Sequence, residues 1–229
     1  MSKYFTLLLI VSVCVGCFPT GKNEPIEPVT LPSVNWEEGK TSTDGAATEG
    51  EFRIKFETTV GDFTLLVHRD WAPLGAERLH QLVKSKFYDG VVFHEVSPGV
   101  IQFGISGDPK ATAYWDQPIE DEPVKESNYA GVVAFAQKGE NSRTTQLWVN
   151  LVANPYKDAL GCSPVAEVES GWAVVKSINP EYGINANAKR LKEKGNEYIF
   201  EKFPKMDYII KATIVPNGSD AAAASGTKK

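Results

Sequence analysis

The sequence is poor in cysteine and histidine, and it has no excess of positive charge. Three cysteines among 229 residues (Cys14, Cys17 and Cys162) cannot form a disulfide scaffold. Lys and Arg number 24 against 29 Asp and Glu, a net charge of -5, whereas a nucleic-acid-binding surface needs a dense basic patch. The histidines have no metal-ligand spacing with one another or with Cys162, so we expect no metal and no cofactor. The hydrophobic content of 42%, in contrast, is that of a globular chain able to bury a core.

The first sixteen residues have the pattern of a signal peptide. A basic residue precedes an apolar run over residues 5–15 that is too short to span a bilayer, and no second run of membrane length follows. Gly16 then precedes Cys17, which resembles the lipobox of bacterial lipoproteins, although Cys14 stands where Leu is usual. We therefore expect residues 1–16 to be removed and Cys17 to be lipidated. Simple secretion and a buried helix are the alternatives.

Composition divides the remaining chain into three parts. Residues 17–51 are rich in Pro, Gly, Thr and Glu without a persistent period, which predicts a flexible, lipid-anchored tether. Residues 216–229 are small and polar and predict a disordered tail. The folded domain is therefore expected at 52–215. An anchored tether implies an exported protein held by a membrane in the cell envelope or periplasm.

Hydrophobic periodicity within this domain predicts a mainly β fold. Alternating residues predict two strands over 51–68 around a tight turn, and further strands over 91–96, 131–136, 146–152, 164–168 and 208–215. Helical spacing predicts helices that begin at Pro73, that follow Gly171 and that span 187–203, with the charges of 189–194 on a solvated face. Residues 99–130 predict a long loop, and such loops are usually functional. Many short strands with two or three helices suggest a closed antiparallel barrel with helical covers.

Four segments in sequence order resemble the cyclophilin-type peptidyl-prolyl isomerases: GDFTLLVHRDWAP, KSKFYDGVVFHEVSPG, IQFGISGDP and GVVAFAQKGENSRTTQLWVN. The most specific pieces are Phe87–His94, Ser106–Pro109 and Thr145–Trp148. The versions IQFGISGDP, SRTTQLWVN and GNEYIFEKFPKMDYI look closest to a bacterial envelope, lipoprotein branch of the family. The resemblance implies a closed eight-stranded antiparallel barrel capped by two helices, to which this chain adds a C-terminal helix. It also implies a monomeric isomerase of Xaa-Pro bonds that acts on proline-containing polypeptides during protein folding in the envelope.

The catalytic position of the family is changed in this chain. Prolyl isomerisation breaks no covalent bond, but it must twist an amide whose partial double bond gives a barrier of roughly 18–20 kcal/mol. The family uses an Arg that donates towards the prolyl nitrogen and the substrate carbonyl, and preorganised donors of this kind are usually a large catalytic effect. The resemblance places Glu95 there, and an ionised carboxylate cannot donate. We therefore expect weakened activity, and a non-catalytic module that binds proline peptides is the alternative.

The residues at the peptide-binding positions match the family better than the catalytic position does. The resemblance places Gln102, Ala136 and Gln146 at matching positions, and Gln137 in place of an Asn. It implies a proline pocket with a larger floor residue than the usual Phe and with a cation on its rim, built from Val100, Ile101, Trp148, Tyr156, Lys157 and Cys162. Cys162 is expected to be a small buried filler in the pocket wall, and Lys157 could pair with Glu95.

One residue is missing between Glu95 and Gln102 relative to the family. A one-residue shift would exchange the two faces of the strand, unless the turn at Pro98-Gly99 absorbs it. At the distance before Gln102 where the family has its Arg, this sequence has His94, which could then act as a substitute donor. The alternative is a histidine packed beside the barrel.

Overall fold

An amphipathic hairpin begins the part of the chain that the computed structural model describes, residues 50–215. Strands β1 (Phe52–Thr58) and β2 (Gly61–Val67) pair antiparallel around a two-residue turn, and alternate side chains are buried. The rings of Phe56 and Phe63 stack across the pair with their centroids 5.0 Å apart. The predicted hairpin is therefore confirmed, because alternation puts every second residue of each strand into one core.

The predicted signal peptide, the lipidation at Cys17, nearly all of the predicted tether and the predicted tail lie outside the described residues. Within residues 50–215, no helix is long and apolar enough to cross a membrane.

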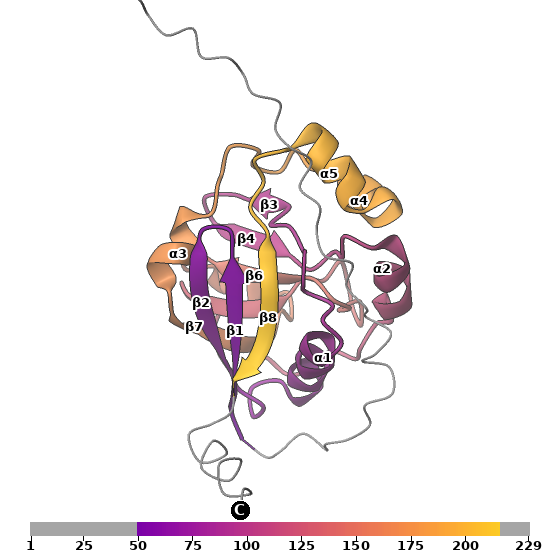
Figure 1. The fold of residues 1–229 in the computed structure, drawn as a ribbon. Helices are drawn as coiled ribbons and strands as arrows, with labels where there is room; N and C mark the ends of the chain where they lie inside the picture. The colour runs from indigo at the N-terminus through magenta and orange to yellow at the C-terminus, as the bar shows by residue number, and fades with distance from the viewer. Residues whose placement is uncertain (1–49, 216–229) are drawn as a thin grey trace, which may run out of the picture.

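Eight antiparallel strands form one curled sheet (Figure 1), in the order β3-β4-β6-β5-β7-β2-β1-β8. The remaining strands are β3 (Glu95–Val96), β4 (Val100–Phe103), β5 (Val132–Phe135), β6 (Leu147–Asn150), β7 (Pro164–Ser170) and β8 (Ile209–Val215). The edges at β3 and β8 meet through the segment just before β3: Val92 forms a bridge with Tyr208, and the amide of Phe93 donates to the carbonyl of Asp207 at 3.0 Å. The mainly β, eight-stranded antiparallel fold is thus confirmed.

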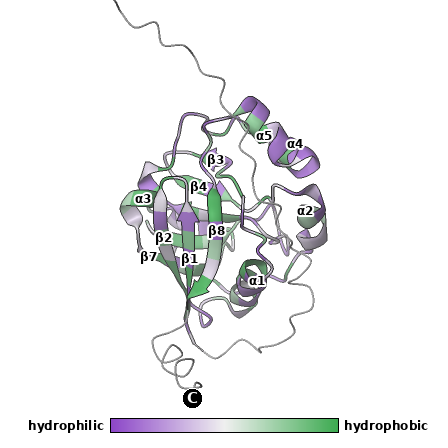
Figure 2. Cartoon of the chain, in the orientation of Figure 1, coloured by the Kyte–Doolittle hydropathy of each residue, from purple (hydrophilic) through white to green (hydrophobic). Residues whose placement is uncertain are grey.

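Helices pack around this sheet (Figure 1), and buried side chains of some of them join the core that the strands enclose. Helix α1 (Pro73–Lys84) packs against β7 and β8, and α3 (Trp172–Ser177) packs against β2. A second group, α2 (Pro109–Trp115), α4 (Ala188–Lys194) and α5 (Asn196–Lys202), lies together on another side, and η2 (Pro155–Lys157) is a single 3-10 turn. Figure 2 shows a mainly hydrophilic α4, in contrast to the hydrophobic β8.

Three predicted elements differ in the structure. The strand expected over 91–96 is regular only at Glu95–Val96, because the residues before it pair irregularly with the start of β8. The loop expected over 99–130 contains β4 and α2. The helix expected over 187–203 is two helices separated at Gly195, whose φ of +63° and ψ of -152° no helix permits. A Cβ at this glycine would lie 2.0 Å from the carbonyl oxygen of Gly107, so close backbone contact breaks the helix.

Candidate functional site

A row of three side chains points away from the barrel core across neighbouring strands. In the ladder, Glu95 of β3 lies opposite Gln102 of β4, which lies opposite Trp148 of β6. All three are partly exposed, while the adjacent Val96 and Ile101 are buried in the core. Glu95 and Gln102 therefore share the outward face of the sheet.

A tight turn lies between β3 and β4, where the sequence predicts that a missing residue could be absorbed. The amide of Ser97 donates to the carbonyl of Val100 at 2.9 Å, and the Ser97 hydroxyl accepts from the amide of Val100 at 3.2 Å. This closes a tight four-residue turn between β3 and β4, and it keeps Glu95 in register with Gln102.

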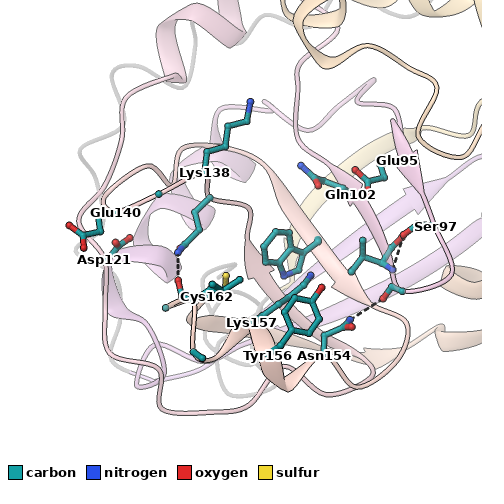
Figure 3. Close-up of a pocket in the computed structure, with 18 of the residues that line it drawn as sticks. Glu95, Ser97, Gln102, Asp121, Lys138, Glu140, Asn154, Tyr156, Lys157 and Cys162 are labelled. Carbon is teal, nitrogen blue, oxygen red and sulfur yellow. Dashed lines mark hydrogen bonds between the residues drawn. The ribbon is translucent and has the colours of Figure 1, made fainter.

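The row borders a cavity of about 1120 Å³ that holds most of the predicted site (Figure 3). Figure 3 shows Glu95 and Gln102 at one end of the cavity and Asp121 and Glu140 at the other, with Lys157 and Cys162 between them. The predicted residues lining it are Glu95, Val100, Gln102, Gln137, Trp148, Tyr156, Lys157 and Cys162.

A second cavity of about 690 Å³ adjoins the first. The two share five residues, among them Glu95, Gln102 and Trp148. The predicted residues that it adds are His94, Ala136 and Gln146. The amide Nε2 of Gln102 donates to Oε1 of Gln146 at 3.0 Å, which orients both glutamines along the wall of this cavity.

Two predicted site residues are placed differently from the others. Ile101 is 1% exposed and belongs to the barrel core, so it contributes nothing to either cavity wall. His94 is 4% exposed, and its Nδ1 has no hydrogen-bond partner among the described residues. Burial lowers the pKa of His94 to about 4, although the Val92 backbone and the Gln146 side chain act in the opposite direction. The imidazole is therefore neutral at pH 7, and its placement favours the histidine packed beside the barrel.

Lys157 and Trp148 make a direct cation–π contact inside the larger cavity. The ammonium Nζ lies 3.5 Å from the centroid of the indole, and Lys157 is only 5% exposed. Burial lowers the pKa of Lys157 to about 8, although the nearby Cys162 and Glu95 act in the opposite direction. Burial also raises the pKa of the Cys162 thiol, so that side chain is an uncharged part of the wall at neutral pH.

A buried polar network holds the turn that carries Lys157. The carboxylate of Asp158 accepts from the Ser127 hydroxyl and from both the backbone and the side-chain amide of Asn128, the last at 2.7 Å. Asn128 is fully buried and accepts from Asn150, which in turn accepts from Asn154 just before η2. The backbone of this turn is therefore rigid, while the Lys157 side chain keeps its rotatable bonds.

Sequence reasoning missed several residues that the structure brings to the site. The larger cavity is also lined by Ser97, Asp121, Lys138, Glu140, Asn154 and Leu160, and the smaller one by Ile184 and Lys189 near α4. The predicted solvated helix face of α4 thus partly faces the site. No local signal marked it, because only the tertiary structure places α4 at the wall of the smaller cavity. Among residues 50–215, no group of three His, Cys, Asp or Glu side chains is arranged to hold a metal ion.

Comparison with known proteins agrees with this geometry. The model of the family described as cyclophilin type peptidyl-prolyl cis-trans isomerase/CLD matches residues 53–196. The peptidyl-prolyl cis-trans isomerase cypE of Dictyostelium discoideum is 29% identical over 136 residues, covering 56% of this chain and 85% of that protein. The isomerase ppi1 of Schizosaccharomyces pombe is 28% identical over 133 residues, covering 55% of this chain and 83% of its own length.

Solved structures share the fold at low sequence identity. A cyclophilin type peptidyl-prolyl cis-trans isomerase of Cryptosporidium parvum aligns with a TM-score of 0.54 and 16% identity, covering 73% of this chain and 99% of that one. The same protein solved in the presence of the dipeptide Ala-Pro aligns with a TM-score of 0.51 and 18% identity, covering 72% of this chain and 99% of that one. Because the family model spans more than half of the sequence and the barrel matches, the chain belongs to the cyclophilin-type peptidyl-prolyl cis-trans isomerase family.

Proposed function

We propose that this family member binds Xaa-Pro segments of exported polypeptides in the cell envelope and isomerises them slowly. The observation that carries the proposal is the outward row of Glu95, Gln102 and Trp148 along the larger cavity. The row supplies an amide and an aromatic face for gripping a proline peptide, but a carboxylate where the resemblance places the catalytic cation. The neighbour solved with Ala-Pro supports a proline-containing ligand.

The expected loss of rate follows from the missing donor. Removal of one preorganised donor from an active site typically lowers the catalytic rate by about 10²–10³-fold. An ionised Glu95 would also repel the carbonyl oxygen of a bound peptide. Gln102 and Gln146 remain available to orient the backbone, so binding should be affected less than catalysis.

A second candidate function is non-catalytic binding of proline peptides. The outward carboxylate of Glu95 favours it, because an ionised carboxylate beside Gln102 cannot donate a hydrogen bond to the prolyl amide. Both candidates use the same groove, and they differ in whether a bound peptide exchanges its cis and trans forms faster than in water.

Exchange spectroscopy of a Xaa-Pro peptide by NMR separates these functions. We expect slow exchange with the wild-type chain, no gain with Glu95→Gln, and faster exchange with Glu95→Arg. Glu57→Arg, on β1 and outside both cavities, is the matched control for the change of charge. Wild-type exchange at rates typical of the family would contradict the proposed impairment. An inert wild-type chain whose peptide shifts nevertheless saturate would favour the binding module.

The location in the envelope is a separate proposal, which the N-terminal sequence pattern supports. If Cys17 is lipidated, the intact mass of membrane-extracted protein should exceed that of the chain cleaved after Gly16 by the mass of its acyl groups. Cys17→Ser should abolish this increment and release the protein from membranes, whereas Cys14→Ser should change neither. A soluble wild-type chain without added mass would exclude the lipid anchor.

A further inference from the structure

The indole of Trp148 is already covered by a side chain of the protein itself. Lys157 Nζ lies 3.5 Å from the ring centroid, which is van der Waals contact distance, so no proline ring can lie between them. Both residues line the larger cavity beside Val100 and Gln102. A ligand that is to use this aromatic face must therefore compete with Lys157.

The turn below Lys157 cannot move away easily. The Lys157 amide donates to the carbonyl of Asn154 at 3.0 Å, and its carbonyl accepts from the amide of Cys162 at 3.1 Å. The Asp158–Asn128 network fixes the same turn from the other side. Only the side chain of Lys157, with its four rotatable bonds, is free to leave the indole.

The ammonium is held weakly enough to be displaced. Among the described residues, Lys157 Nζ has no ion pair within 4.0 Å and no hydrogen bond, so the indole is its direct partner. The groups that act on it electrostatically are Glu95 from β3 and Cys162 beyond η2. The other charged residues lining the cavity are Asp121, Lys138 and Glu140.

We propose that Lys157 determines whether a proline ring can occupy this pocket, because the ring reaches Trp148 only after the Lys157 side chain swings into solvent. This inference rests on the proposed binding of proline peptides in the groove. It makes Lys157 a specificity-determining residue that acts by occupying the subsite itself.

Proton linkage gives the proposal a definite sign. The pKa of Lys157 is about 8 in the cavity, whereas a lysine in water has a pKa of about 10.4. At a pH between these two pKa values, Lys157 is protonated in a complex that leaves it in solvent, but it is largely deprotonated in the free protein. Peptide affinity should therefore fall as pH rises, by about tenfold between pH 7 and pH 9. A peptide that instead stacked over a resident Lys157 would bury it further, and affinity would then rise with pH.

The test is the dissociation constant of a terminally blocked, uncharged Ala-Ala-Pro-Ala peptide, measured by NMR titration at pH 7, 8 and 9. Lys157→Ala removes the competing side chain and should bind about 2- to 30-fold more tightly at pH 7, the factor that corresponds to loss of one cation–π contact. Lys157→Arg keeps a permanent cation on the indole and should bind no better than the wild type. Neither variant should show the pH dependence, while Lys110→Met, at an exposed position of α2, should retain the wild-type profile.

Direct observation of Lys157 completes the test. The ¹³Cε shift of Lys157 should titrate near pH 8 in the free protein and close to pH 10 in the complex. Affinity that rises with pH, or equal affinities for wild type and Lys157→Ala at every pH, would overturn the role of Lys157 while leaving peptide binding intact. If neither wild type nor Lys157→Ala binds the peptide, the proposed function itself fails.

Discussion

Arg143 is a fully buried cation that ties two loops at the far end of the groove, and replacing it with Met is expected to destabilise the fold strongly. Its Nη1 lies 3.0 Å from Oε2 of Glu122, and its Nη2 donates to the carbonyl of Glu120. Glu122 in turn accepts from the amides of Leu74 and Gly75 at 2.7 and 3.0 Å, in the first turn of α1. One buried pair therefore joins the 116–122 loop to a helix and to the strand-connecting loop that contains Arg143.

The expected loss is about 3–5 kcal/mol of unfolding free energy, the usual result of removing one partner of a buried ion pair. Arg143 is 0% exposed, and the Glu122 side chain is 6% exposed. Arg143→Met keeps most of the apolar volume, so the loss comes chiefly from the unpaired Glu122 carboxylate and the released carbonyl of Glu120. Its two backbone donors at α1 retain part of the stabilisation of Glu122.

A double-mutant cycle measures this coupling. Urea unfolding followed by tryptophan fluorescence should be compared for wild type, Arg143→Met, Glu122→Gln and the double variant. The double variant should lose about 1–3 kcal/mol less than the sum of the single losses. Arg190→Met, on an exposed position of α4, should change stability by less than about 0.5 kcal/mol. A loss below about 1 kcal/mol for Arg143→Met, or strictly additive single effects, would refute the reasoning.

Three further changes test other parts of the fold. The pKa of His94 is about 4 in the folded chain and about 6.5 when unfolded. The stability that neutral His94 contributes is therefore complete above pH 6.5 and is lost as pH falls towards 4. In urea titrations, the wild type should lose about 2–3 kcal/mol more unfolding free energy than His94→Gln between pH 7 and pH 4.5. Gly195→Ala should cost about 2–3 kcal/mol in thermal unfolding, because the new Cβ would meet the Gly107 carbonyl at 2.0 Å in a conformation open only to glycine. Asp158→Ala should cost about 1–3 kcal/mol and increase amide exchange in η2, because it removes the acceptor of two hydrogen bonds from the fully buried Asn128 and leaves only the Cys162 carbonyl. Unchanged exchange in η2 would count against the network.

Local sequence signals were sufficient where an element obeys its own period. The alternation of β1 and β2 predicted a hairpin, and Pro73 predicted the start of α1. The signals failed where a distant segment intervenes. The pattern over 187–203 is helical throughout, but the approach of the Gly107 carbonyl forces a break at Gly195. Likewise, β3 is short because the residues before it pair with the segment entering β8.

The candidate site divides in the same way. Family resemblance predicted Glu95, Gln102 and Trp148 as site residues, but their shared face depends on the tight turn between β3 and β4. Ile101 was expected in the pocket wall and lies in the core, because it alternates with Gln102 along β4. The lining of the second cavity by Lys189 could not be predicted, since no periodicity reports which helix lies beside a groove.

The sequence by itself determined the mainly β character of this protein and its family, because these depend on local alternation and on motif identity, and it led to the expectation that Glu95 stands where the family has a catalytic cation. Only the tertiary structure decided that Lys157 covers Trp148, that His94 is buried and neutral, and that Arg143 ties the loops around the groove. These depend on contacts between residues distant in sequence and on the water that such contacts exclude. Burial and the distance to neighbouring groups determine the charge and mobility of a side chain, and the residue type alone predicts neither.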